Sequence, residues 1–317
     1  MDPSFSEYLQ ARRAEIEAAL AAALPAPPDC PAVVADAMRY SVTAGGKRLR
    51  PILCLAAAEA VGGDRALALP AACAIELIHT YSLIHDDLPA MDNDTMRRGH
   101  PTLHVVAGEG MAILAGDGLL TEAFALLARA PETADPALVA RKLRVAGVVA
   151  VAAGATGMVG GQALDLASSI PAPATPATPA AVFDADGLRV MHSKKTGALI
   201  RASVQLGALL GDADSASLQA LSRFGDKLGL VFQIVDDVLD VEATSAQLGK
   251  TAGKDQGACK FTFPALLGLS ESKRYAEQLT QQAIEILERL PQASVRRSPV
   301  NTSRLKELCL FLVHRNN

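Results

Sequence analysis

The stretch SLIHDDLPAMDNDTMRRG (residues 82–99) ends an apolar run with Asp86 and Asp87, then adds two further acids and two arginines. Clustered carboxylates repel one another unless a divalent cation lies between them. Oxygen ligands suit Mg²⁺, which uses one or two protein carboxylates together with substrate phosphates. Arg97 and Arg98 supply planar guanidinium groups that match phosphate oxygens. Taken alone, a solvated acidic turn explains the stretch equally well.

A second acidic stretch, FQIVDDVLD at residues 232–240, changes that balance. Asp236 and Asp240 are four residues apart, so a helix places both carboxylates on one face. An apolar run again leads into the acids, which places them at the rim of a core. Two stretches of this design argue against chance. We expect them to face each other across a helical cavity and to hold several Mg²⁺ ions around one diphosphate.

DDLPAMD followed by RRG, with DDVLD downstream, resembles the two aspartate-rich motifs of the trans-isoprenyl diphosphate synthases, and most closely those of bacterial farnesyl diphosphate synthases. The resemblance runs through nearly the whole chain. It implies an all-α fold, a single isoprenoid synthase domain over residues 1–317 built as a helical bundle around a central cavity. It also implies Mg²⁺ as cofactor, with three ions per active site, and a homodimer.

The composition agrees with such a fold. Half of the 317 residues are hydrophobic, 4% are aromatic and none is Trp, which suits packed helices better than a β-rich fold. The net charge of -4 argues against nucleic-acid binding. Five scattered cysteines without a CxxC pair indicate reduced thiols in a cytoplasmic protein. We expect neither a signal peptide nor a membrane span.

Helical periodicity and turn residues predict most of the elements. A proline-rich surface loop is expected at 168–181, because prolines fix φ and lack a backbone donor. The expected helices cover residues 5–24, 31–44, 52–61, 66–88, 102–127, 136–160, 188–210, 270–290 and 303–313.

The stretch GGKRLRP (residues 45–51) places three cations before a proline at a helix start. Helix N-termini favour anions, so the stretch is a candidate diphosphate seat, with a basic surface loop as the alternative. The family resemblance implies that Lys47 and Arg50 bind the diphosphate of isopentenyl diphosphate. It adds His79 and Arg98 as further ligands, whereas a lone helical His is more often structural.

The resemblance also assigns the allylic diphosphate and the metal. Lys195, which precedes a Thr-Gly pair expected to kink its helix, is implied as a diphosphate ligand, and Thr196 and Gln233 as oxygens beside the developing positive charge. Gln162 and Asp165 either point into the cavity or brace the site. Further diphosphate ligands are implied at Arg97, Lys250 and Lys260, although Cys259 departs from the family pattern, and Arg315 is a weaker candidate. The implied metal ligands are Asp86, Asp92 and Asp236, supported by Asp87, Asp94 and Asp240.

The spacing of the first motif needs an explanation. Asp86 and Asp92 are six residues apart and do not align on an ideal helix. A distortion or a helix end must absorb the extra residues, and Pro89 favours either.

The expected reaction condenses isopentenyl diphosphate with dimethylallyl or geranyl diphosphate and releases diphosphate. Tyr81 precedes Asp86 by about one and a half turns of a helix, with Ser82 beside it, and in the family an aromatic side chain at the position of Tyr81 limits chain growth. With the two-residue insertion, this favours (2E,6E)-farnesyl diphosphate, the C15 product. Geranylgeranyl (C20) and geranyl (C10) diphosphate remain alternatives. A terpene cyclase would not need GGKRLRP, and a non-catalytic regulatory subunit would be expected to lose carboxylates.

Overall fold

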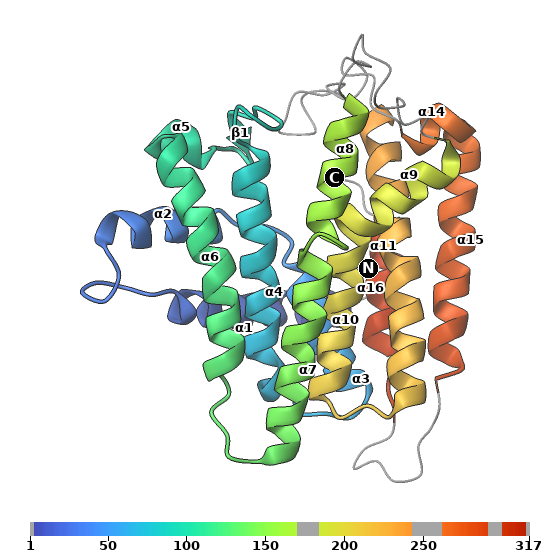
Figure 1. The fold of residues 1–317 in the computed structure, drawn as a ribbon. Helices are drawn as coiled ribbons and strands as arrows, with labels where there is room; N and C mark the ends of the chain where they lie inside the picture. The colour runs from blue at the N-terminus through green and yellow to red at the C-terminus, as the bar shows by residue number, and fades with distance from the viewer. Residues whose placement is uncertain (1–2, 170–183, 243–261, 291–299, 315–317) are drawn as a thin grey trace. The chain divides into compact units, whose positions relative to one another are not determined.

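The computed structural model describes residues 3–169, 184–242, 262–290 and 300–314, and within them the chain is helical apart from one short β pair (Figure 1). The all-α prediction is therefore confirmed. The chain divides into two compact units, and each is described by itself below. Unit 1 comprises Met1–Val148, Ser203–Asp214 and Gln292–Arg304; unit 2 comprises Val149–Ala202, Ser215–Pro291 and Leu305–Asn317.

Unit 1 is built around helix α4 (Arg65–Asp86), which packs against α3 and α6 (Figure 1). Most of α4 is buried, because its long apolar run contains small alanines that let neighbouring helices approach closely. Its N-terminus is capped by Asp64, whose side chain accepts a hydrogen bond from the Ala66 N–H. The other helices are α1 (Pro3–Ala23), α2 (Ala32–Thr43), α3 (Leu49–Ala60), α5 (Leu103–Ala107), α6 (Glu109–Arg129) and most of α7 (Pro136–Ala153).

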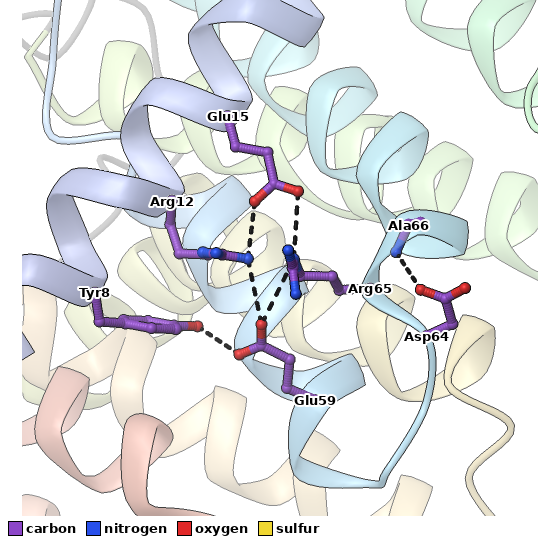
Figure 2. A network of polar contacts seen from close by, with 7 residues as sticks. All are labelled: Tyr8, Arg12, Glu15, Glu59, Asp64, Arg65 and Ala66. Atoms are coloured by element: carbon purple, nitrogen blue, oxygen red, sulfur yellow. Dashed lines mark hydrogen bonds and ion pairs between the residues drawn. The ribbon is translucent and has the colours of Figure 1, made fainter.

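Polar side chains also hold α1 to α3 in unit 1, as Figure 2 shows. The Tyr8 hydroxyl donates to Glu59 over 2.8 Å, and Arg12 pairs with Glu15 over 2.8 Å. Arg65, the first residue of α4, places its Nε 3.3 Å from Glu15 Oε1. Burial and the neighbouring Glu59 raise the pKa of Tyr8, so its hydroxyl remains a donor.

Unit 2 centres on α11 (Ser215–Glu242), which packs against α15 (Leu269–Glu288) (Figure 1). Its core includes Val231, Ile234 and Phe263, all at most 1% exposed. Gly229 of α11 touches the backbone of Gly197, where a Cβ would lie 2.6 Å from the Gly197 Cα. The remaining elements include α8 (Met158–Ser169), α9 (Ala185–His192), η1 (Ser193–Gly197), α14 (Phe263–Leu267) and nearly all of α16 (Ser303–Val313); α10 (Ala198–Leu210) contributes to both units.

Three expected helices are interrupted. The one at 102–127 breaks at Gly108, whose φ of 84° ends α5 before α6 begins. The one at 136–160 breaks between α7 and α8, at a turn closed by the Gly157 N–H on the Gly154 carbonyl. The one at 188–210 contains a π-helical turn, η1, at the Thr-Gly pair. The helix is therefore irregular at the place where a kink was expected, and the kink itself stays a prediction.

The absence of a membrane span, which was expected from the sequence, stays a prediction. Among the described residues, three helical stretches are long and apolar enough to cross a membrane by length and composition. The window in α4 is 67% buried inside the protein, which fits an internal helix that is apolar on all sides. The other two are 39% and 33% buried, and they lie in Glu109–Arg129 and Pro136–Ser168.

Candidate active site

The first acidic motif lies where α4 ends in unit 1. The helix stops at Asp86, two residues before the expected end, so a helix end and not a distortion accounts for the spacing of the motif. The chain then folds back so that the Asp92 N–H donates to the Asp86 carbonyl over 2.9 Å. Asp94 makes the corresponding bond to the Asp87 carbonyl over 3.2 Å. The turn therefore brings the backbones of Asp86 and Asp92 together, with both side chains half-buried.

Asp87 behaves differently from its neighbour. It is 4% exposed, and Arg97 donates to both of its oxygens from Nε over 2.7 and 3.0 Å and from Nη2 over 2.6 Å. Burial raises the pKa of Asp87, while the bonds from Arg97 act in the opposite direction. Two residues predicted to bind metal and diphosphate thus bind each other.

A β-hairpin that the sequence analysis missed carries the two arginines. Strand β1 (Met96–Arg97) pairs antiparallel with β2 (His100–Pro101), and Arg98 and Gly99 connect them with φ of 54° and 79°. Positive φ at both central residues is the geometry of a type I′ turn. The turn sends the two side chains to different partners, since Arg97 binds Asp87 and Arg98 Nη1 donates to the Gly45 carbonyl.

The basic stretch before α3 surrounds that contact. Gly46 has φ of 135°, which favours glycine, and the Arg98 guanidinium packs where a Cβ would stand, 2.6 Å from Nη1. Lys47 is exposed and Arg50 is half-buried in the first turn of α3. The predicted diphosphate seat therefore combines a helix N-terminus with side chains from two segments.

Arg48 is turned into unit 1 and is not exposed with its neighbours. It is 3% exposed, and it donates to Glu76 over 2.8 Å and to the Val42 carbonyl over 2.6 Å. A buried cation of this kind is retained only when paired. Glu76 was the available signal, because it is a lone acid within the apolar run of α4.

His79 lies on α4 among the arginines of this region. Its pKa is lowered well below the usual value, first by burial and then by Arg50, Arg98, Arg97 and Arg48. His79 is therefore neutral near pH 7, and the surrounding positive charge is held by guanidinium groups. The structure thus brings together four predicted diphosphate ligands of unit 1, namely Arg50, His79, Arg97 and Arg98.

The two predicted chain-length residues lie one turn before the first motif. Tyr81 is 6% exposed and contacts His85 edge-on, with ring centroids 5.7 Å apart. His85 in turn lies against Gly116 of α6, where a Cβ would come within 2.1 Å of its Nε2. The Tyr81 ring is thereby held in place. Ser82 donates its hydroxyl to the His79 carbonyl over 2.9 Å.

The second acidic motif lies on α11 in unit 2. Asp236 and Asp240 are half-buried, as the helical spacing allows. Asp237, which the sequence analysis left unassigned, is 5% exposed and accepts hydrogen bonds from Gln233 Nε2 over 2.8 Å and from the Phe263 N–H over 3.0 Å. Burial raises the pKa of Asp237 to about 7, and these two bonds act to lower it.

The π-helical turn η1 brings the predicted catalytic groups of unit 2 together. The Thr196 hydroxyl donates to Gln233 Oε1 over 3.0 Å, and Lys195 Nζ pairs with Asp165. Gly161 makes room for this pairing, since a Cβ there would lie 2.1 Å from the Lys195 backbone nitrogen. Asp165 therefore braces Lys195, one of the two roles considered for it.

A buried histidine, His192, lies next to Asp237 and Phe263 in unit 2. His192 is 6% exposed and stacks on Phe263 with ring centroids 5.5 Å apart. Burial lowers its pKa to about 4, so it is neutral and forms no ion pair with Asp237, although its Nε2 lies 3.8 Å from that carboxylate.

The acids of the two motifs supply the oxygen ligands that Mg²⁺ prefers. Within the described ranges, no group of three or more His, Cys, Asp or Glu side chains converges on one point. Each unit instead offers a pair of half-buried carboxylates, and Mg²⁺ completes its shell with phosphate oxygens and water. The residues present therefore fit Mg²⁺ held jointly with a diphosphate. Lys250, Cys259, Lys260 and Arg315, together with most of the loop at 168–181, lie outside the described residues.

Comparisons with known proteins give the same assignment. The polyprenyl synthetase family model matches residues 31–296. A dimethylallyltranstransferase of Fischerella ambigua is 50% identical over 87% of this chain and 76% of its own length. A second relative is large subunit 1 of a chloroplastic heterodimeric geranylgeranyl pyrophosphate synthase of Arabidopsis thaliana. It is 46% identical over 88% of this chain and 72% of its own length.

A crystal structure of an FPP/GFPP synthase from Zymomonas mobilis matches with a TM-score of 0.82 at 34% identity, over 99% of this chain and 100% of that chain. The isoprenoid synthase fold expected from the motifs is therefore confirmed. The family also implies Mg²⁺-dependent catalysis. From its motifs, its fold and these matches, the chain belongs to the polyprenyl synthetase family of trans-prenyltransferases, which condense isopentenyl diphosphate with allylic diphosphates.

Proposed function

We propose that unit 1 binds the diphosphate of isopentenyl diphosphate through Lys47, Arg50, His79 and Arg98. The support is the arginine cluster around a neutral His79, next to the N-terminus of α3. Guanidinium groups match phosphate oxygens, and backbone N–H groups at a helix start add to the attraction. Neutral His79 contributes one ring N–H as a donor and adds no further charge.

As the family resemblance implies, we assign the allylic diphosphate to the outer acids of both motifs, acting through Mg²⁺, and to two cations. Arg97 uses Nε and Nη2 for Asp87, so Nη1 is the end that reaches a phosphate oxygen. Lys195 is braced by Asp165, which aims its ammonium group. Bound Mg²⁺ supplies Lewis-acid stabilisation of the charge that develops on the departing diphosphate. The acids that would hold it are Asp86, Asp92, Asp236 and Asp240.

The observation that carries this proposal is the shared arrangement of the two motifs. In each, the inner acid is buried and bonded to protein, while the outer acids are half-buried. The C–O bond of the allylic substrate breaks, and the double bond of isopentenyl diphosphate attacks the resulting cation to form a C–C bond. The departing diphosphate then accepts the proton that the newly joined cation loses as its double bond forms. Oxygens of Thr196 and Gln233 stabilise the cation electrostatically.

For product length, we propose geranylgeranyl diphosphate, C20. The support is that most of the curated relatives considered carry the name geranylgeranyl diphosphate or pyrophosphate synthase. This favours the alternative over the C15 product that the sequence predicted. Farnesyl diphosphate is kept as a second candidate because of one observation, the fixed and buried Tyr81 ring one turn before Asp86.

The direct test incubates pure protein with Mg²⁺, isopentenyl diphosphate and dimethylallyl, geranyl or farnesyl diphosphate, and resolves products by chain length. We expect condensation with each primer and accumulation of C20. Accumulation of C15, with farnesyl diphosphate left unused, would contradict the C20 proposal and keep the reaction. Absence of condensation with every primer would contradict the residue roles assigned above.

A variant tests the role of the aromatic ring separately. Tyr81→Ala removes a buried ring before the first motif, and we expect the main product to lengthen by at least one C5 unit. Tyr40→Phe is the control, since Tyr40 lies on α2 and only its hydroxyl bond to the Pro101 carbonyl is lost. An unchanged product profile for Tyr81→Ala would contradict the chain-length role.

We also propose that the protein is a homodimer, a state supported by the family resemblance. Light scattering of the pure protein measures this directly. We expect twice the mass of one chain, and the mass of a single chain at micromolar concentration would contradict the proposal.

A further inference from the structure

Asp237 has no role in the proposed reaction, although it lies between two proposed metal ligands. Its side chain is 5% exposed, whereas those of Asp236 and Asp240 are half-buried. Both of its oxygens are used, since Oδ1 accepts from Gln233 Nε2 and Oδ2 accepts from the Phe263 N–H. Two donors therefore fix the orientation of this carboxylate.

The bond to Gln233 has a consequence one residue further on. An amide has a donor end and an acceptor end, so a nitrogen that faces Asp237 leaves the oxygen to face Thr196. The structure has this arrangement, with the Thr196 hydroxyl donating to Gln233 Oε1 over 3.0 Å. The hydroxyl hydrogen of Thr196 is thereby directed toward Gln233.

We propose that Asp237 is a positioning residue that sets the direction of this hydrogen-bond chain, so that Thr196 presents oxygen lone pairs, and not its O–H, to the allylic cation. The proposal rests on the function proposed above, in which Thr196 and Gln233 lie beside that cation. Lone pairs attract a developing positive charge, whereas the positive end of an O–H dipole repels it. The chain would therefore act on the ionisation step and not on substrate binding.

The surroundings hold the chain in one geometry. Gly229 of α11 contacts the backbone of Gly197, which fixes η1 against the helix that carries Gln233. Phe263 is 1% exposed and stacks on His192, which fixes the N–H that Asp237 accepts. A carboxylate bonded from two rigid sides leaves the Gln233 amide one favourable orientation.

Asp237→Asn tests the direction without changing size. The oxygen of the new amide must face the Phe263 N–H, because two donors cannot bond each other, so the new NH₂ group faces Gln233. The Gln233 amide then turns over, and Thr196 becomes an acceptor whose O–H points elsewhere. We expect kcat to fall by about 10- to 100-fold, with KM for both substrates changed less than about twofold.

A second substitution should reverse the effect. In Asp237→Asn/Gln233→Glu, the carboxylate introduced at position 233 accepts from Thr196 and from the amide introduced at position 237, which restores the original direction with the same total charge. We expect kcat within about fivefold of the wild type in this double variant. Asp226→Asn, on the surface of the same helix, is the matched control and should leave both constants unchanged.

The outcomes separate this inference from the proposed function. If the wild type condenses its substrates and Asp237→Asn keeps wild-type kcat, the inference is overturned and the function stands. A loss of kcat that the double variant does not recover also overturns it, as does an equal rise in both KM values. If the wild type does not form a diphosphate product longer than its primer, the proposed function is contradicted instead.

An NMR measurement on the wild type covers the case in which the variants do not fold. The side-chain amide signals of Gln233 are assigned in the wild type through their bonded correlations to the Gln233 backbone. We expect nuclear Overhauser contacts from these protons to the Phe263 N–H, because both groups converge on Asp237. Dominant contacts to the Thr196 methyl group instead would overturn the inference.

Discussion

The two acidic motifs resemble each other in sequence but hold their inner acids by different means. Asp87 of unit 1 is bound by the Arg97 guanidinium, whereas Asp237 of unit 2 accepts, among the described residues, from an amide and a backbone N–H. Both carboxylates are about 5% exposed or less. The first is therefore balanced by a full positive charge and the second by dipoles, which agrees with the pKa of Asp237 being raised to about 7. Equal motifs need not have equal electrostatics.

The outer acids differ in what fixes their separation. Asp86 and Asp92 are brought together by a backbone hydrogen bond after α4 has ended, while Asp236 and Asp240 lie one turn apart within α11. The first pair depends on a reverse turn and the second on an uninterrupted helix. One motif can therefore be disturbed without the other.

The largest expected effect is on activity, and it should be equal for the two motifs. Asp86→Asn and Asp236→Asn should each lower kcat by about 10³-fold, because each removes a carboxylate proposed to hold the Mg²⁺ that stabilises the departing diphosphate. The midpoint temperature of thermal unfolding should change by less than about 2 °C for both variants. Asp226→Asn serves as the control. A loss below tenfold for either variant would show that its motif does not hold the metal.

The inner acids should differ in stability. Asp87→Asn should lower the free energy of unfolding by about 2 kcal/mol, a value reduced from that of a fully buried pair because the Arg97 side chain is 32% exposed. Asp237→Asn should cost less than about 1 kcal/mol, since a reoriented amide can replace its bonds. Urea denaturation measures both. Equal costs would remove the electrostatic distinction between the motifs.

A smaller effect should appear with pH, and it can be measured at His192 of unit 2. The pKa of His192 is lowered from 6.5 to about 4 by burial, so the unfolded chain binds a proton first as pH falls below 6.5. The contribution of neutral His192 is complete above pH 6.5 and is lost toward pH 4. Relative to His192→Phe, the wild type should therefore be less stable at pH 5 than at pH 7.5. Parallel denaturation curves at the two pH values would contradict this.

The smallest effect is expected away from both motifs. Tyr8→Phe removes the hydroxyl bond to Glu59 in the network of Figure 2 and should lower the free energy of unfolding by about 1 kcal/mol. Steady-state kinetics should not change, because this network lies outside the proposed site. A change in KM for isopentenyl diphosphate would indicate that α1 and α3 position the basic stretch.

Local patterns were sufficient to predict much of this molecule. A helix end at the first motif was one of the two outcomes expected from Pro89 and the six-residue spacing, and the irregularity in the 188–210 helix followed from a Thr-Gly pair. Side-chain partners could not be predicted in this way, because adjacent acids such as Asp236 and Asp237 look alike until tertiary contacts are known. Arg48 likewise reads as one more cation of a basic stretch until Glu76 is found beside it.

The backbone bond between the Asp92 N–H and the Asp86 carbonyl also sets which changes the first motif can tolerate during evolution. A bond between main-chain atoms does not use the side chains of the intervening residues, and Pro89 and Ala90 are exposed. Substitutions at Ala90 should therefore be nearly neutral in a mutational library. Deleting or inserting a single residue there would change the length of the turn and misplace Asp92, so insertions and deletions should be selected against.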